Sequence, residues 1–131
     1  MSGSLYVIDT NIVIPFLNGD SKVVARFKNL KEVQIPYVVV GELFFGALKS
    51  YNSEKNISLI NSFVGTHCRV LYPSYETLRR YGQIKKALVE KGKPIPENDI
   101  WISAVAFENG FTLVSRDKHF KEVEGLTIEV W

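Results

Sequence analysis

Short, unbroken apolar runs alternate along this sequence with longer stretches of helical periodicity. The first run, Leu5-Tyr6-Val7-Ile8, is ended by the acidic Asp9. An apolar run without polar alternation is typical of a strand that is buried on both faces of a sheet. The sequence therefore predicts a sheet with helices packed on both of its sides.

The alternation continues to the end of the chain. We expect strands at residues 5–8, 33–35, 69–71, 111–114 and 126–130. We expect helices at residues 11–17, 21–30, 37–50, 53–64, 74–91 and 97–108, and a short helix at 117–121. Ser74 is the expected N-cap of the long helix, and Pro36 is expected to end the second strand. Strands separated by helices favour an α/β protein, a single-domain α/β/α sandwich around a mainly parallel five-stranded sheet.

The composition limits the number of domains and the kinds of partner. A length of 131 residues fits one domain, 1–131, and a hydrophobic share of 46% is enough to fill one core. A formal net charge of +2 does not by itself indicate nucleic-acid binding, so such a role must come from local placement of charge. No run approaches the roughly 20 apolar residues of a membrane span, so we expect no membrane partner.

Cysteine and histidine are scarce. The single cysteine, Cys68, excludes an internal disulfide and fits a reducing compartment. Residues 1–4 lack the charged start of a signal peptide, so we expect a cytoplasmic protein. With only His67 and His119 beside that cysteine, the usual kind of zinc site cannot be assembled.

Four acidic residues stand where this fold would place them at one edge of the sheet. Asp9 directly follows the first predicted strand, and Asp117 follows the fourth by two residues. Asp99 lies in the first turn of a predicted helix, and Glu42 lies about one and a half turns into another. Because ligands of open α/β sheets bind beyond the carboxyl ends of the strands, the four side chains could converge on one cleft.

Such a cluster has a definite chemical requirement. Four carboxylates within a few ångströms repel one another, so they would partly protonate unless a cation neutralises them. Mg²⁺ and Mn²⁺ prefer oxygen ligands of this kind. An acidic cluster without histidine or cysteine therefore indicates phosphodiester chemistry rather than peptide hydrolysis.

Each acid taken alone also has a structural interpretation. Asp9 and Asp117 could cap helices, and Asp99 could stabilise a helix N-terminus through its charge. Glu42 is harder to explain in this way, because it stands in a strongly apolar stretch where burial of an unpartnered carboxylate is costly. His119 could act as a general base, but capping or packing beside its apolar neighbour is the simpler interpretation.

The segments around these acids form a recognisable set. They read Val7-Ile8-Asp9-Thr10-Asn11, Gly41-Glu42-Leu43 with Gly46, Asn98-Asp99-Ile100-Trp101-Ile102 with Ala104 and Ala106, and Leu113-Val114-Ser115-Arg116-Asp117 with His119-Phe120. Each motif alone is weak, but all four occur in order and at family-like spacing. Together they resemble PIN domains, in particular the VapC-type toxins of toxin–antitoxin pairs. The resemblance spans the chain from Leu5 to Trp131.

This resemblance implies an activity and its partners. It implies an endoribonuclease that depends on Mg²⁺ or Mn²⁺, cuts structured RNA, forms homodimers and is silenced by a small cognate antitoxin. Asp9 and Asp99 match the principal metal ligands of the family. Glu42 and Asp117 match its two other acids, which complete the shell of the metal or its water.

The resemblance also extends to the neighbours of the acids. Thr10 and Ser115 match small hydroxyl residues that support the cluster or contact phosphate. Asn11 matches a polar residue that is common in the family shortly after the first acid, and Asn98 matches a polar residue that is common just before the third acid. Apart from the resemblance, Arg116 and Lys118 flank Asp117 at the expected cleft, where they could contact an RNA phosphate or simply face solvent.

Two other classes of function compete with the nuclease. A non-catalytic PIN-like module would bind RNA or protein without cutting, but degenerate relatives lose acids and this chain keeps all four. A phosphotransferase or response-regulator-like protein would form an aspartyl phosphate. A haloacid-dehalogenase-type site needs a second aspartate two residues after Asp9, where this chain has Asn11, and a receiver domain needs an acid pair after its first strand.

Overall fold

The computed structural model describes residues 5–131, so the expectation of no signal peptide at residues 1–4 lies outside the described residues. The strands are β1 (Tyr6–Ile8), β2 (Val33–Pro36), β3 (Cys68–Leu71), β4 (Thr112–Val114) and β5 (Ile128–Glu129). The helices are α1 (Thr10–Leu17), α2 (Ser21–Lys28), α3 (Tyr37–Leu48), α4 (Ser53–His67), α5 (Tyr75–Glu90) and α6 (Glu97–Asn109), followed by the 3-10 helix η1 (Lys118–Glu122). Within residues 5–131, no helix has both the length and the apolar character that crossing a membrane requires.

The five strands form one sheet in the order β3-β2-β1-β4-β5, and the strand pairings are parallel. The predicted α/β class and five-stranded parallel sheet are therefore confirmed. Successive residues of the central strands, such as Val7 and Ile8 in β1 and Leu113 and Val114 in β4, are fully buried. This burial on both faces is the physical reason for the unbroken apolar runs in the sequence.

The topology places a switch point at β1. The chain moves from β1 outward to β2 and β3, and then returns to form β4 on the other side of β1. The two strands are in register with Ile8 opposite Val114, and the Asp9 N–H donates to the Val114 carbonyl at 3.0 Å. The residues that follow β1 and β4 therefore emerge side by side, where open α/β sheets bind their ligands.

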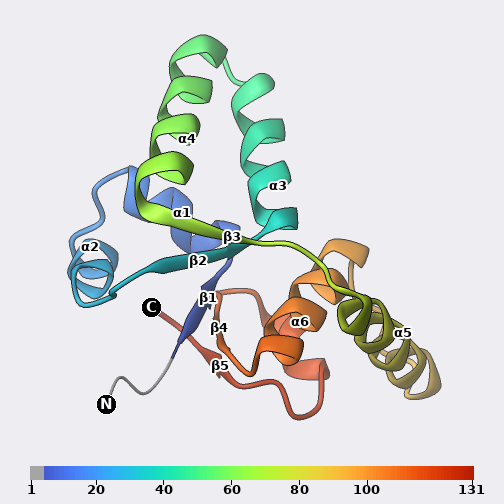
Figure 1. Cartoon of the computed structure of the whole chain (residues 1–131). Coiled ribbons are helices and arrows are strands. Elements are labelled where there is room, and N and C mark those ends of the chain that lie inside the picture. Colours follow the sequence, from blue (N-terminus) through green and yellow to red (C-terminus); the bar gives the residue numbers. More distant parts are fainter. Residues whose placement is uncertain (1–4) are drawn as a thin grey trace.

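The helices pack as pairs around this sheet. α3 packs along α4, and α5 packs along α6. Figure 1 shows the α3–α4 pair projecting upward from the sheet, while α5 and α6 lie together at the lower right of the view, with α6 near the base of α3. Side chains for a site at the sheet edge can therefore come from α3 on one side and α6 on the other.

The ends of most elements follow the sequence signals. Ser74 caps α5 through its hydroxyl, which accepts the Thr77 N–H at 3.4 Å, and Gly110 ends α6 in the left-handed conformation at φ +68°. The second strand does end at Pro36, which is the last residue of β2 and extends the predicted strand 33–35 by one residue. A proline lacks the N–H donor yet keeps its carbonyl, so it can occupy the last position of a strand. The short helix after Asp117 is a 3-10 helix.

Candidate acidic active site

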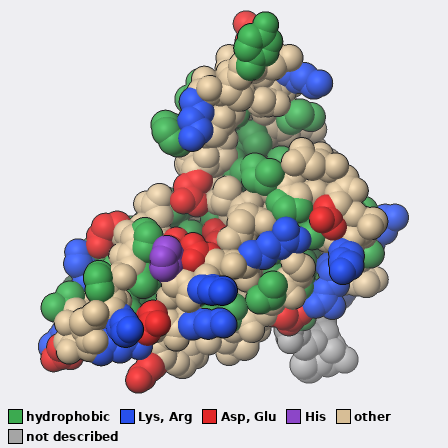
Figure 2. All heavy atoms as spheres, turned by 180° about the vertical axis from the view of Figure 1, so that it is seen from behind, with side chains coloured by type: hydrophobic (Ala, Val, Ile, Leu, Met, Phe, Trp, Pro, Cys, Tyr) green, Lys and Arg blue, Asp and Glu red, His purple; other side chains and the backbone are tan. Residues whose placement is uncertain are grey.

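All four acids predicted from the sequence line one open cleft of about 500 Å³. Asp9 follows β1, Glu42 lies on α3, Asp99 on α6, and Asp117 on the loop after β4. Figure 2 shows acidic side chains gathered near the middle of one face, at the base of the projecting α3–α4 pair, with lysine and arginine side chains close by. Four separate elements thus deliver one carboxylate each to the same space.

Asp9 is the most deeply buried of these acids, at 5% exposure. It is the N-cap of α1, and its Oδ1 accepts the Thr10 N–H at 2.8 Å. Its Oδ2 accepts the Ser115 hydroxyl at 2.7 Å. Burial raises the pKa of Asp9, the two hydrogen bonds oppose that rise, and the charges of Glu42 and Asp117 add to it.

Asp99 occupies the first turn of α6 and is 8% exposed. Burial, followed by the negative charges of Asp117 and Asp9, raises its pKa to about 6. The hydrogen bond with the His119 ring partly opposes this rise, and Nδ1 of that ring lies 3.2 Å from Asp99 Oδ2. The raised pKa of Asp99 thus has two causes, the loss of water around its carboxylate and the negative charges close to it.

Glu42 is held by two polar neighbours from other elements. The Thr10 hydroxyl donates to Oε1 at 2.7 Å, and the Asn98 amide donates to Oε2 at 3.3 Å. These contacts resolve the sequence puzzle of an acid in an apolar stretch, because the carboxylate reaches the cleft and is hydrogen-bonded there. Thr10 and Asn98 therefore fix the direction of this side chain.

Ser115 connects the ends of the two central strands. Its hydroxyl donates to Asp9 and accepts the Asp117 N–H at 3.0 Å. The Asn11 amide lies 3.4 Å from the same hydroxyl, and the Asn11 Oδ1 accepts the Arg116 N–H at 3.1 Å. One nearly buried serine thus sets the distance between two of the acids.

Arg116 contributes to this network through its backbone only. Its side-chain Nε donates to the carbonyl of Trp131 at 2.9 Å, which directs the guanidinium toward the C-terminal residue. The contact with an RNA phosphate therefore stays a prediction, and it would compete with this hydrogen bond.

His119 is a residue that sequence reasoning undervalued. Asp117 caps η1 by accepting the His119 backbone N–H at 2.9 Å, so the histidine donates to the cap and is not the capping residue itself. Its ring, however, also lies between two of the acids, with Nδ1 3.0 Å from Asp117 Oδ1 as well as 3.2 Å from Asp99 Oδ2. The sequence feature that could have indicated this placement of the ring is the position of His119, two residues after an aspartate that caps a turn.

An apolar groove of about 330 Å³ adjoins the cleft. It runs between α1, α3 and α4, and it shares Thr10, Ile14 and Glu42 with the acidic cleft. Leu59 of α4 lines it and is 47% exposed. Exposed apolar side chains therefore continue from the acids along one side of the molecule.

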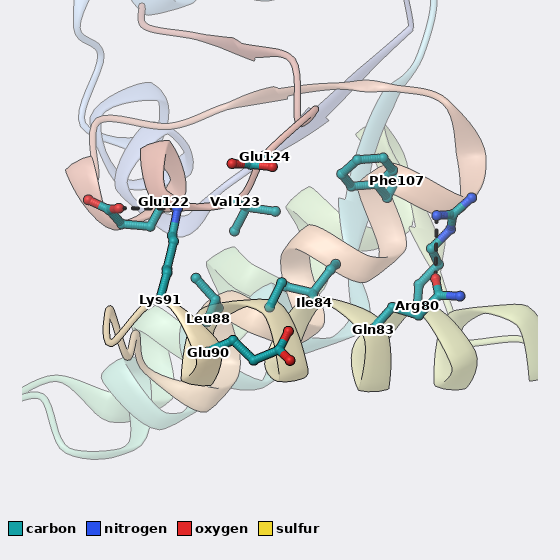
Figure 3. A pocket seen from close by; sticks show the side chains of 11 residues that line it. Arg80, Gln83, Ile84, Leu88, Glu90, Lys91, Phe107, Glu122, Val123 and Glu124 are labelled. Atoms are coloured by element: carbon teal, nitrogen blue, oxygen red, sulfur yellow. Dashed lines mark hydrogen bonds and ion pairs between the residues drawn. The ribbon is translucent and has the colours of Figure 1, made fainter.

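A separate cavity of about 410 Å³ lies between α5 and residues 122–124 (Figure 3). Its floor is formed by apolar side chains that include Ile84 and Leu88, and the Lys91 ammonium at its rim pairs with Glu122 at 3.4 Å. It shares no lining residue with the acidic cleft. We therefore assign the candidate active site to the cleft.

Comparison with known proteins agrees with this geometry. The PIN domain family matches residues 6–126. Ribonuclease VapC2 of Haemophilus influenzae is 36% identical over 129 residues, covering 96% of this chain and 97% of that protein. The tRNA(fMet)-specific endonuclease VapC of Shigella flexneri is 33% identical over 129 residues, covering 96% of this chain and 97% of that protein.

Solved structures show the same fold. DNA-bound VapBC from Salmonella typhimurium superposes with a TM-score of 0.91 at 27% identity and covers 98% of both chains. VapBC2 from Rickettsia felis, bound to a DNA fragment from its promoter, superposes with a TM-score of 0.87 at 29% identity. The match covers 96% of this chain and 98% of the Rickettsia chain.

Removing the charge of Asp99 should stabilise the metal-free protein near neutral pH. The pKa is about 6 in the folded protein against 3.8 as the ordinary value, so folding disfavours the ionised form. The contribution of Asp99 to stability is fully present below pH 3.8 and is lost as the pH rises through about 6. In EDTA, we expect Asp99→Asn to raise the free energy of unfolding by roughly 1 to 3 kcal/mol near neutral pH and by little near pH 4.

Urea denaturation followed by circular dichroism at the two pH values measures this effect. Glu54→Gln removes an exposed acid of α4 outside the cleft and should change stability little at either pH. An Asp99→Asn protein no more stable than wild type near neutral pH would contradict the crowding of this carboxylate.

Proposed function

The chain belongs to the PIN domain family and, within it, to the VapC ribonucleases, and from this premise we propose that it is an endoribonuclease whose acidic cleft holds a divalent metal ion. The observation that carries this proposal is the meeting of Asp9, Glu42, Asp99 and Asp117 in one open cleft. The openness of the cleft suits a polymeric substrate that enters from the side.

The donor set fits a hard divalent ion. The four acids offer carboxylate oxygens, the ligands preferred by Mg²⁺ and Mn²⁺. The pKa values of Asp9 and Asp99 are raised by burial and by neighbouring negative charge, which is the electrostatic cost that a cation would remove. We assign Asp9 and Asp99 as the principal ligands, with Glu42 and Asp117 completing the shell. When bound, the ion would make a water molecule more acidic and stabilise charge that develops on the phosphoryl group.

The remaining residues of the cleft orient the acids. The Ser115 hydroxyl occupies one oxygen of Asp9 and the Thr10 N–H occupies the other, so the carboxylate cannot rotate freely. Thr10 and Asn98 hold Glu42 in the same way, each through one oxygen. Such outer contacts preset the positions of the ligands before substrate arrives. Water would attack the phosphorus in line, the bond to the 3′ oxygen would break, and that oxygen would leave with a proton, so the products would carry the 5′-phosphate and 3′-hydroxyl ends that the resemblance to VapC toxins implies.

We propose a structured RNA as the substrate and the cytoplasm as the place of action. Two related proteins are named ribonuclease and tRNA(fMet)-specific endonuclease. The alternative of a non-catalytic PIN-like module that binds RNA or protein is less favoured, because such a module has no need for four acids in one cleft. Phosphate contacts with basic side chains near the cleft would make RNA affinity fall with added salt.

The apolar groove beside the cleft supports a protein partner. Several solved relatives are VapBC structures, and from the resemblance to VapC-type toxins we propose that a small cognate antitoxin also binds this chain. Apolar side chains of its peptide arm would lie in the groove beside Ile14 and Leu59, and a basic side chain would pair with the acids. The exposed Phe45 on α3 supports a further apolar contact, and we propose a homodimer.

Loss of any cleft acid should strongly slow RNA cleavage. We expect Asp9→Asn, Asp99→Asn, Glu42→Gln and Asp117→Asn each to slow cleavage of total RNA with Mg²⁺ or Mn²⁺ by at least about 100-fold, since each removes a charge that the reaction needs. Ser115→Ala should slow it by about 10- to 100-fold, because that serine orients Asp9 and the Asp117 backbone but carries no charge that the reaction needs. Gel electrophoresis of timed reactions measures the rates, with Glu54→Gln as the control of unchanged activity. Equal cleavage by Asp99→Asn and wild type would remove the cleft from the mechanism.

Induced expression in a bacterial host tests the toxin role and its partner together. The wild type should arrest growth and Asp99→Asn should not, and co-expression of a small protein encoded beside the gene should restore growth. Leu59→Asp should remain toxic but escape this rescue, because it places a charge in the apolar groove. Val89→Asp, at an exposed position of α5 outside the groove, should be rescued like wild type. Full rescue of Leu59→Asp would contradict docking in the groove.

A further inference from the structure

His119 is placed at the acidic cleft by the turn that follows Asp117. Asp117 caps η1 by accepting the His119 N–H at 2.9 Å, which fixes the backbone of the histidine beside the carboxylate. The next residue, Phe120, is fully buried and anchors η1 in the core. Because the backbone is held on both sides, the His119 ring is directed toward the cleft while 51% of its side chain stays exposed.

The ring nitrogen and two carboxylate oxygens form a group with the spacing of metal ligands. Nδ1 of His119 lies 3.0 Å from Asp117 Oδ1 and 3.2 Å from Asp99 Oδ2, and one potential ligand atom from each residue lies within 4.8 Å of the others. An octahedral ion with bonds of about 2.1 Å places adjacent ligand atoms about 3 Å apart. The two separations from Nδ1, 3.0 and 3.2 Å, are close to that edge.

We propose that His119 is a direct ligand of the divalent ion, through Nδ1 and beside Asp99 and Asp117, and that it makes the cleft prefer Mn²⁺ over Mg²⁺. This inference rests on the proposed function, which supplies the ion. Mg²⁺ is held by carboxylates, phosphates and its own waters, whereas first-row transition ions accept an imidazole nitrogen readily. A nitrogen in the shell therefore adds affinity for Mn²⁺ and little for Mg²⁺.

The competing arrangement is an ion pair in which a charged imidazole neutralises the two acids without touching a metal. Both arrangements place Nδ1 near the carboxylates, so activity alone does not separate them. A Mn²⁺ ion reports its ligands directly, because the nuclear spin of a coordinated ¹⁴N modulates its electron spin echo. The measurement is pulsed EPR on the purified, EDTA-treated chain loaded with Mn²⁺.

We expect nitrogen modulation from wild type, its loss in His119→Ala, and its retention in His67→Ala. His67 is a suitable control because it packs near Phe16 and Phe63, outside the cleft. Calorimetry should show the Mn²⁺ affinity of His119→Ala reduced by about 10-fold or more, with little change for Mg²⁺. Absence of nitrogen modulation in wild type, or its persistence in His119→Ala, would overturn the proposal.

The same samples separate this inference from the proposed function. Binding of Mn²⁺ that is lost in Asp99→Asn but shows no nitrogen coupling would keep the metal-dependent nuclease and reject His119 as a ligand. Binding that does not change in Asp99→Asn, or no binding by wild type, would reject both.

Discussion

Electrostatic repulsion among four carboxylates at one edge of the sheet is the constraint on which the rest of this structure depends. The strand order β3-β2-β1-β4-β5 creates the meeting point, because β4 returns beside β1 and brings its loop next to Asp9. α3 and α6 then add one acid each from either side. The fold thus assembles an arrangement that is unfavourable without a cation, and the raised pKa values of Asp9 and Asp99 express that cost.

Within residues 5–131, short polar contacts and the His119 ring hold the acids of the cleft, and no lysine or arginine forms an ion pair with them. Ser115 and Thr10 supply hydroxyl donors to Asp9 and Glu42, and such neutral donors orient a carboxylate without neutralising it. The negative charge therefore stays available to a ligand. A divalent ion would relieve this repulsion, and a basic side chain of the proposed antitoxin would relieve it in the same way.

Much of this architecture could be predicted from the sequence because the signals are local. Buried strands leave unbroken apolar runs, as at β1, and the residue that follows each strand is placed at the sheet edge by topology alone. The role of the His119 ring could not be predicted, because its direction depends on the turn η1 and on the buried Phe120. The bond of Arg116 to the Trp131 carbonyl joins distant parts of the chain, and the groove beside the cleft depends on how α1, α3 and α4 pack. Such contacts leave no local pattern.

Anomalous diffraction from crystals grown with Mn²⁺ would show whether the four carboxylates bind a divalent ion. We expect a strong anomalous peak in the cleft, about 2.1 Å from carboxylate oxygens of Asp9 and Asp99. No peak among the four acids at saturating Mn²⁺, or a peak only at another surface, would contradict it.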